Sequence, residues 1–282
     1  MARGRSPVMQ RRRLAAELQR LRGASGRTLE EVAERLECSP AKISRIENNL
    51  VAVRIQDARE LLDFYRVSGE RREELLTMVR EARRKGWWSA YSAVMDESTE
   101  NLLSLEEDAV RVSIYDERAV SPLLQTPDYA RAQLTAADEL DSAAIERRVE
   151  LLAERQRIAT GPDGPQLAIV LDEAPLRRYA GGTAIMAGQL DRLIHASDQN
   201  KLELRVMPFS RGPSNAQGFP AQIFEFAADP RVVYTEQFGG GGRMIEAAEE
   251  VGLYLSAFEQ LWARALTPSA TRDFLKALRV EL

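Results

Sequence analysis

The chain has 282 residues, 44% of them hydrophobic, and this length suits two folded domains better than one. A single cysteine, Cys38, excludes an internal disulfide, and no apolar run is long enough to span a membrane. Because the amino terminus also lacks a signal-peptide core, we expect a cytoplasmic protein without a membrane partner.

Charge is distributed unevenly along the chain. Residues 1–90 contain 20 Lys and Arg and 13 Asp and Glu, a net charge of +7. The whole chain carries −4, so the remaining residues carry −11. Such asymmetry is typical of one domain that meets phosphates and a second that does not.

The first 22 residues are basic, with seven arginines and one acid, Glu17. Their second half is predicted to be a helix, because Leu14, Leu18 and Leu21 recur at helical spacing. The arm RGRSP (residues 3–7) either lies in a minor groove or stays disordered, and its composition favours disorder.

Residues 28–48, TLEEVAERLECSPAKISRIEN, contain two short amphipathic helical patterns, each with its own capping residue. Thr28 and Glu31 form a capping box before the first pattern. Ser39 is the predicted cap of the second, and Pro40 follows it at the first helical position. Each pattern has an apolar stripe, made by Leu29, Val32, Ala33 and Leu36 in the first and by Ile43, Ile46 and Leu50 in the second.

The opposite face of the second helix carries Lys42, Arg45 and Asn49 at i, i+3 and i+7. A short basic helix held on an apolar seat by a partner helix fits a major groove, so the pattern favours a DNA-binding helix-turn-helix. Helix pairs with tight turns also occur in all-α proteins that bind no DNA. An exposed basic face is often only a solvated face.

Two more helical patterns follow, around residues 55–65 and 75–82, so five helices are expected in a domain of residues 1–85. Residues 11–85 resemble the Xre-type, Cro/repressor-like, helix-turn-helix family. The resemblance implies that the start of the second helix and the exposed face of the third approach DNA. We accordingly predict DNA contacts at Thr28, Ser39, Ala41, Lys42, Ser44, Arg45 and Asn49.

The resemblance further implies an ion pair between Glu47 and an arginine of the first helix, either Arg22 or Arg20. Two positions depart from the family pattern. Glu37 stands where the turn usually has Gly, so a residue with a Cβ is expected to take positive φ at some strain. Leu29 stands where the second helix usually begins with Gln, which removes one amide from the DNA-facing surface.

Residues 86–98 are predicted to be a linker and residues 99–282 a second domain. Its pattern predicts helices over residues 99–115, 143–158, 246–266 and 269–278, and one with Met186, Leu190 and Leu193 on its apolar face. Short β-like runs cover residues 166–171, 202–207, 221–226 and 232–236, the last two as a hairpin. The expected class is α+β overall: an all-α amino-terminal domain, then a mixed domain of helices around a small sheet.

The second part also resembles a known domain. SPLLQTPDYARA, ERQRI, LDEAPLRR, MAGQLDRL, RVMPFSRG, GFPAQIFEF and VVYTE occur in this order and are similar to the domain of unknown function that follows an Xre-type helix-turn-helix in actinobacterial regulators. The resemblance implies a transcription regulator with a small partner protein encoded nearby, and supplies no ligand or activity. Gln125, Tyr129, Arg155 and Gln156 lie in these strings and are the predicted effector or partner residues, although structural hydrogen bonding explains them equally well.

Residues that could support catalysis have simpler interpretations. His195 is the one histidine and no GxSxG accompanies it, so it is interpreted as a helix-surface residue. Asp172 and Glu173 follow a strand, but they also suit the first turn of a helix. The glycines of residues 239–242 lack the spacing of a phosphate-binding loop and are interpreted as a flexible loop.

We therefore expect no enzyme activity, no cofactor and no metal site. The predicted function is a homodimeric transcription regulator that binds double-stranded operator DNA. Its second domain dimerises and senses a small partner protein or a ligand. The alternatives are a toxin-like or enzymatic protein with an autoregulatory helix-turn-helix, and a small-molecule-responsive repressor.

Overall fold

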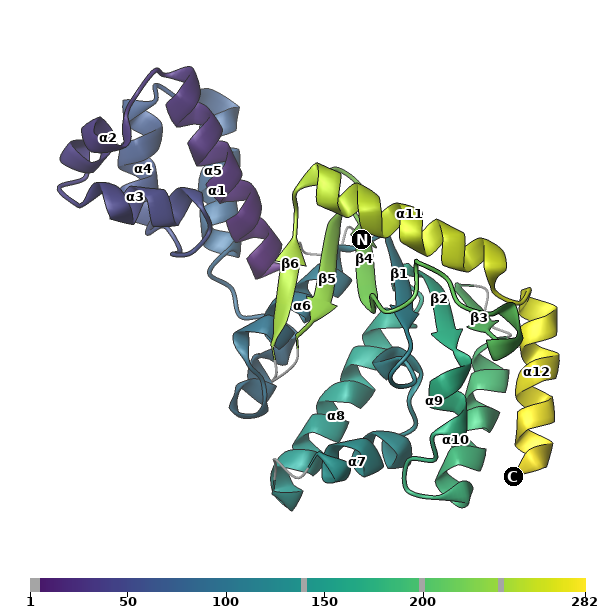
Figure 1. Cartoon of the computed structure of the whole chain (residues 1–282). Helices are drawn as coiled ribbons and strands as arrows, with labels where there is room; N and C mark the ends of the chain where they lie inside the picture. The colour runs from purple at the N-terminus through teal and green to yellow at the C-terminus, as the bar shows by residue number, and fades with distance from the viewer. Residues whose placement is uncertain (1–5, 138–140, 198–200, 238–240) are drawn as a thin grey trace. The chain divides into compact units, whose positions relative to one another are not determined.

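The computed structural model describes residues 6–137, 141–197, 201–237 and 241–282. The chain forms two compact units that meet in sequence at Ser89 and Ala90 (Figure 1). This junction falls within the predicted linker, residues 86–98, and inside the 3-10 helix η1 (Trp87–Val94). Most of the arm predicted over residues 3–7 lies outside the described residues, and Ser6 caps the first helix.

In the amino-terminal unit, helices surround one apolar core, as the sequence predicts. Their bounds are α1 (Pro7–Ala24), α2 (Leu29–Arg35), α3 (Pro40–Glu47), α4 (Ile55–Phe64) and α5 (Gly69–Glu81). Each contributes to the same buried cluster, for example Leu18, Val32, Ile43, Leu61 and Leu75. The prediction of an all-α domain with five helices is confirmed within the described residues.

The turn between α2 and α3 holds a residue in a strained conformation. Glu37 has φ +48°, in the left-handed region that favours glycine, which confirms the expectation for this position. Ser39 then caps α3, because its Oγ accepts a hydrogen bond from the backbone N–H of Lys42 at 3.3 Å. The turn that sets the direction of α3 therefore contains one strained residue, Glu37, and one side-chain cap, Ser39.

Helix α3 ends earlier than the sequence suggests. Asn48 is its C-cap, and Asn49 takes the left-handed conformation with φ +58°. The prediction that Leu50 belongs to the buried stripe is wrong, because this residue is 73% exposed whereas Ile43 and Ile46 are buried. Helical spacing no longer relates side chains once the backbone has left helical geometry.

In the part of the carboxy-terminal unit that the structure describes, six strands form one mixed sheet in the order β3-β2-β1-β4-β5-β6 (Figure 1). Their bounds are β1 (Arg111–Asp116), β2 (Gln166–Asp172), β3 (Leu202–Met207), β4 (Ala221–Glu225), β5 (Val232–Glu236) and β6 (Gly242–Ile245). The first three are parallel, and each later strand is antiparallel to its neighbour. The parallel pairs are joined through helices, as crossover connections require.

The helices of this unit cover both faces of the sheet. Their bounds are α6 (Glu97–Asp108), η2 (Pro122–Leu124), α7 (Pro127–Ala136), α8 (Ser142–Ala159), α9 (Glu173–Arg177), α10 (Thr183–Ala196), η3 (Phe209–Arg211), α11 (Ala248–Arg264) and α12 (Pro268–Glu281). Phe258 and Leu261 of α11 pack with Ile223 and Val233 on one face. Helices α8 and α10 lie on the other side (Figure 1).

The predicted mixed domain is confirmed, including the hairpin of β4 and β5 and the helix expected over residues 143–158, which is α8. The prediction of one helix over residues 99–115 is wrong: α6 ends at Asp108, and Arg111–Asp116 is the central strand β1. Strand β6 has no counterpart among the predicted elements. Of the loop expected at residues 239–242, residues 239 and 240 lie outside the described residues, and Gly242 begins β6.

None of the described helices combines the length and apolar character that a membrane span requires.

Replacing Glu37 by Gly is expected to raise the free energy of unfolding by about 0.5–1 kcal/mol, because relief of positive-φ strain outweighs the added flexibility of the unfolded chain. Urea unfolding of the full chain followed by circular dichroism measures the change. The matched control is Glu34→Gly in the exposed part of α2, which is expected to lose about 1 kcal/mol. Equal destabilisation by both variants would contradict a strained Glu37.

Candidate functional site

Helix α3 presents one face to solvent and holds the other on the core. Ile43 and Ile46 are buried, whereas Ala41 and Arg45 are exposed on the opposite side. Because Ile43 and Ile46 are held in the core, only the exposed face of this eight-residue helix is free to meet a ligand. Such a presentation matches the way in which a recognition helix enters a major groove.

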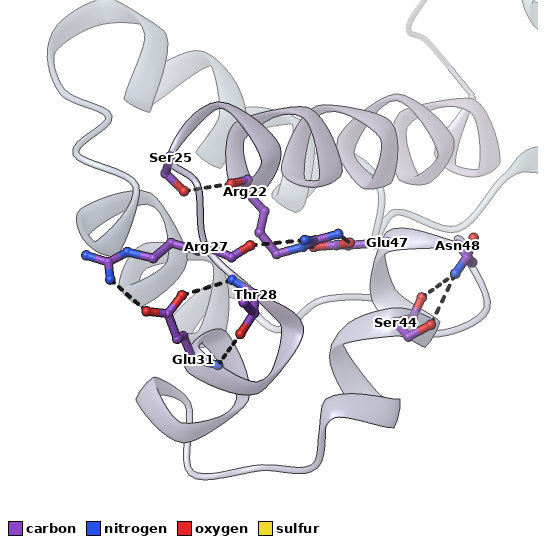
Figure 2. Close-up of polar contacts among 8 residues, drawn as sticks. All are labelled: Arg22, Ser25, Arg27, Thr28, Glu31, Ser44, Glu47 and Asn48. Atoms are coloured by element: carbon purple, nitrogen blue, oxygen red, sulfur yellow. Dashed lines mark hydrogen bonds and ion pairs between the residues drawn. The ribbon is translucent and has the colours of Figure 1, made fainter.

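A bidentate ion pair fixes α3 against α1 (Figure 2). Arg22 Nε donates to Glu47 Oε1 at 2.7 Å, and Arg22 Nη2 donates to Glu47 Oε2 at 2.8 Å. The two side chains are 19% and 4% exposed, and Arg22 Nη1 also donates to the carbonyl oxygen of Arg27. The hydrogen bonds to Glu47 raise the pKa of Arg22.

Arg22 is therefore the arginine that pairs with Glu47, a choice that the sequence resemblance left open between Arg22 and Arg20. The other candidate, Arg20, pairs with Glu17 on the surface of α1. Since Glu47 is fully engaged in this pair, it holds the helix in place and does not face outward.

The start of α2 is held by the predicted capping box (Figure 2). Thr28 Oγ1 accepts from the backbone N–H of Glu31 at 3.2 Å, and Glu31 Oε2 accepts from the backbone N–H of Thr28 at 2.9 Å. Arg27 forms an ion pair with the same glutamate at 3.1 Å. Thr28 is exposed at the helix start, and its hydroxyl is occupied by the cap.

The outward side chains of α3 differ in whether their charges are already paired within the amino-terminal unit. Lys42 Nζ lies 2.8 Å from Asp57 Oδ2 of α4, so its charge is paired within the unit. Arg45 is exposed, and its guanidinium makes one long contact, from Nε to the carbonyl oxygen of Ala41 at 3.4 Å. Of these two predicted base-reading residues, Arg45 is the one free to approach DNA without breaking an ion pair.

The end of α3 carries a residue that the sequence pattern misses. Asn48 is exposed, and its Nδ2 donates to the carbonyl oxygen of Ser44 at 2.8 Å and to Ser44 Oγ at 3.3 Å (Figure 2). Asn49 lies beyond the helix and is half-buried. The i+4 spacing from Ser44 to Asn48 is the signal that could have found it. DNA contact by the predicted residues Thr28, Ser39, Ala41, Lys42, Ser44, Arg45 and Asn49 stays a prediction.

The carboxy-terminal unit contains a pocket of about 500 Å³. Helices α6, α7 and α8 supply its walls, together with η2 and the ends of η1 and β5. Its volume falls within the range typical of small-molecule sites. The apolar lining includes Leu103, Leu134, Leu151 and Leu152, and the polar lining consists of Gln125, Gln133, Arg148, Arg155 and Glu236, with Thr99 at one side.

Two of the predicted effector residues, Gln125 and Arg155, line this pocket, and the other two brace the segment beside it. Gln125 Nε2 donates to the carbonyl oxygen of Val120 at 2.7 Å and to Gln133 Oε1 at 2.8 Å. Gln156 Nε2 donates to the carbonyl oxygens of Pro122 and Gln125 at 2.7 and 2.9 Å. Tyr129 Oη accepts from the backbone N–H of Val120 at 3.3 Å, and burial raises the pKa of this tyrosine.

Arg155 forms a buried ion pair with Glu106 at the pocket wall. Its Nε and Nη2 donate to the two carboxylate oxygens at 2.8 and 2.6 Å, and the side chains are 10% and 6% exposed. Desolvation alone would lower the pKa of Arg155, but the Glu106 carboxylate outweighs it and the pKa is raised. The pair thus stays charged and is neutral as a whole.

The residues weighed as catalytic candidates have structural contacts. Asp172 Oδ1 accepts from the backbone N–H of Ala174 and caps α9. Glu173 accepts from Arg177 Nε and from the backbone N–H of Phe209. His195 is exposed on α10, with Nδ1 close to the carbonyl oxygen of Asp191. Within the described residues, no group of three potential metal-ligating His, Cys, Asp or Glu side chains comes together.

Comparison with known families gives two matches. A helix-turn-helix domain family matches residues 13–75, which include α2 and α3. The domain of unknown function DUF5753 matches residues 99–277, which contain the whole sheet and most of the pocket wall. No curated protein and no solved structure matches the chain.

Substitution of Arg22 by Met is expected to lower the free energy of unfolding by about 3 kcal/mol, because Glu47 would remain buried without its partner. Urea unfolding measures the loss. Arg20→Met is the matched control on the same helix, since Arg20 is 62% exposed and Glu17 keeps its second partner, Arg71. Loss of such a surface arginine is expected to cost about 0–1 kcal/mol. A similar small loss in both variants would contradict the role assigned to Arg22.

Proposed function

Since the chain belongs to the family defined by the domain of unknown function DUF5753 and carries a helix-turn-helix DNA-binding domain before it, we propose that it is a homodimeric transcription regulator. In this proposal α3 reads operator DNA in the major groove. The carboxy-terminal unit holds two chains together and takes the regulatory input.

One observation carries the proposal for α3. Arg45 projects from a helix whose other face packs on the core and is held by Glu47, and among the described residues its guanidinium has only a long contact to the carbonyl oxygen of Ala41. An arginine presented in this way can donate two hydrogen bonds to O6 and N7 of a guanine. The net charge of +7 over residues 1–90 adds attraction to the phosphates.

The small size of the reading surface supports a dimer. An eight-residue helix with few free polar side chains contacts only a half-site. Two copies on a near-palindrome place two such helices about 34–36 Å apart and combine their affinities. The carboxy-terminal unit is large enough to hold this pair and has a surface of net negative charge that does not favour DNA.

The regulatory input is proposed to enter through the carboxy-terminal unit without any chemistry. The structural contacts of Asp172 and Glu173 support this, because their oxygens already accept backbone and side-chain hydrogen bonds. The sequence leaves a small partner protein and a small molecule open as inputs. The pocket of about 500 Å³ favours the small molecule, since a concave site of this size suits a ligand rather than a protein surface.

Replacing Arg45 by Ala is expected to cost about 1–3 kcal/mol of discrimination between the operator and a random duplex. Lys42→Ala is expected to cost less, because Lys42 is paired with Asp57 in the free protein. Footprinting and competition binding with both variants measure the order of the two effects.

The matched control for the Arg45 and Lys42 variants is Asp57→Asn. This change frees the Lys42 amine and is expected to strengthen binding to all duplexes alike. Unchanged operator affinity in Arg45→Ala, with the fold intact by circular dichroism, would overturn the assignment of α3 to DNA.

Residues 1–89 alone are expected to bind operator about a hundredfold more weakly than the full chain, because the second half-site is no longer tethered. Sedimentation velocity of the full chain, free and on operator, is expected to show two copies. A strict monomer under both conditions would exclude the dimer while leaving DNA binding by α3 intact.

A further inference from the structure

The pocket between α6, α7 and α8 is distinguished by one unpaired charge. Arg155 is neutralised by Glu106, and Glu236 is paired with Arg118 at 2.7 Å. Arg148 is exposed and has no carboxylate partner among the residues that the structure describes. Its Nε donates to the carbonyl oxygen of Val94 at 3.0 Å, which leaves the Nη groups as donors.

Unused amide groups lie in the same lining. Gln125 and Gln133 are joined through one hydrogen bond, from Nε2 to Oε1 at 2.8 Å. This leaves Gln125 Oε1 without a donor and Gln133 Nε2 without an acceptor within the described parts of the chain. The lining therefore offers a cation and an amide donor beside apolar residues that include four leucines. Apolar walls with a few polar groups are typical of ligand pockets.

We propose that this pocket binds a small, mainly apolar molecule with one carboxylate, and that Arg148 and Gln133 receive the carboxylate while the leucines of α6, α7 and α8 cover the apolar part. An anionic head is favoured because the lining has an excess positive charge once its two ion pairs are set aside. A cationic head would meet Arg148 unfavourably, and a neutral one would leave its charge without a partner.

The same arginine connects the pocket to the segment that joins the two units in sequence. Val94, whose carbonyl oxygen accepts from Arg148, is the last residue of η1, and η1 contains the junction between the units. The neighbouring Arg147 donates to the carbonyl oxygen of Ala90 at 2.7 Å and lies over the Tyr91 ring at 4.3 Å. A carboxylate on the Nη groups of Arg148 pulls on the same guanidinium whose Nε holds the Val94 carbonyl, so ligand binding is expected to alter how residues 90–94 are held. This regulatory step rests on the proposed function.

Decanoate is a suitable probe, with decanol and decylamine as neutral and cationic counterparts of the same chain length. Titration calorimetry on the full chain is expected to show saturable binding of decanoate at millimolar concentration or below. Arg148→Gln is expected to weaken decanoate about tenfold, as expected for loss of a charge-assisted contact, and to leave decanol unchanged. Arg157→Gln, on the same helix and outside the pocket, is the matched charge control.

A second pair of variants tests the location. Leu152→Trp fills the pocket and is expected to weaken decanoate at least about tenfold. Ala153→Trp adds the same bulk at the next, exposed position of α8 and is expected to bind normally. Absence of saturable decanoate binding, or equal binding in these two variants, would overturn the site.

Operator affinity measured with and without saturating decanoate tests the regulatory step. We expect a change of at least about threefold in the parent chain and none in Leu152→Trp. Decanoate binding without any change in operator affinity would overturn the effector role. The dependence of operator binding on Arg45 is measured in the same assay without decanoate, so failure of the proposed function is recognised separately.

Discussion

The carboxy-terminal unit depends on the pairing of one central strand. Strand β1 is hydrogen-bonded on both edges, in parallel to β2 and antiparallel to β4, so it joins the two halves of the sheet. Val112, Ile114 and Tyr115 are buried, which places β1 inside the core on both faces. Strands buried in this way have few alternatives to their native register, because a shift would expose apolar side chains and leave backbone groups unpaired.

The segment after β1 builds one wall of the pocket. The chain does not turn directly into an α-helix but passes through mostly buried backbone at residues 120–126, in which η2 is the only regular turn and whose polar groups need partners away from water. Side-chain amides supply them: Gln125 donates to Val120, Gln156 to Pro122, and Gln189 Nε2 to the carbonyl oxygen of Leu124 at 2.8 Å. Because these amides are fixed by the backbone that they satisfy, they give this wall a rigid shape. Within residues 121–132, this requirement accounts for Gln125 and for Tyr129, whose hydroxyl oxygen accepts from the backbone N–H of Val120.

Sequence patterns predict the features that depend on local chemistry, such as the capping box of α2 and the short apolar strands β2 to β5. The positive φ of Glu37 is expected from the family resemblance, in which a glycine usually stands at this position. The error at β1 arises because Leu105, Ala109 and Val112 keep helical spacing across the true end of α6, with no glycine or proline to stop it. Pairing of β1 with a strand far away in sequence decides the outcome, and local periodicity does not reveal it. The ion pair of Lys42 with Asp57 and the lining of the pocket cannot be predicted from sequence patterns for the same reason. Both bring together segments that are separate in the sequence and come close only in the folded chain.

In the amino-terminal unit, the residues that hold α3 are separate from those that face outward. Ile43, Ile46 and Glu47 fix the helix through the core and the pair with α1, whereas Arg45 and Asn48 contribute little to that packing. Exposed positions of this kind can change with small effects on stability, typically within about 0.5 kcal/mol. The outward face can therefore vary from one regulator to another while the same scaffold is kept. If α3 reads DNA as proposed, specificity in this chain lies in a few outward side chains, and the scaffold contributes their orientation.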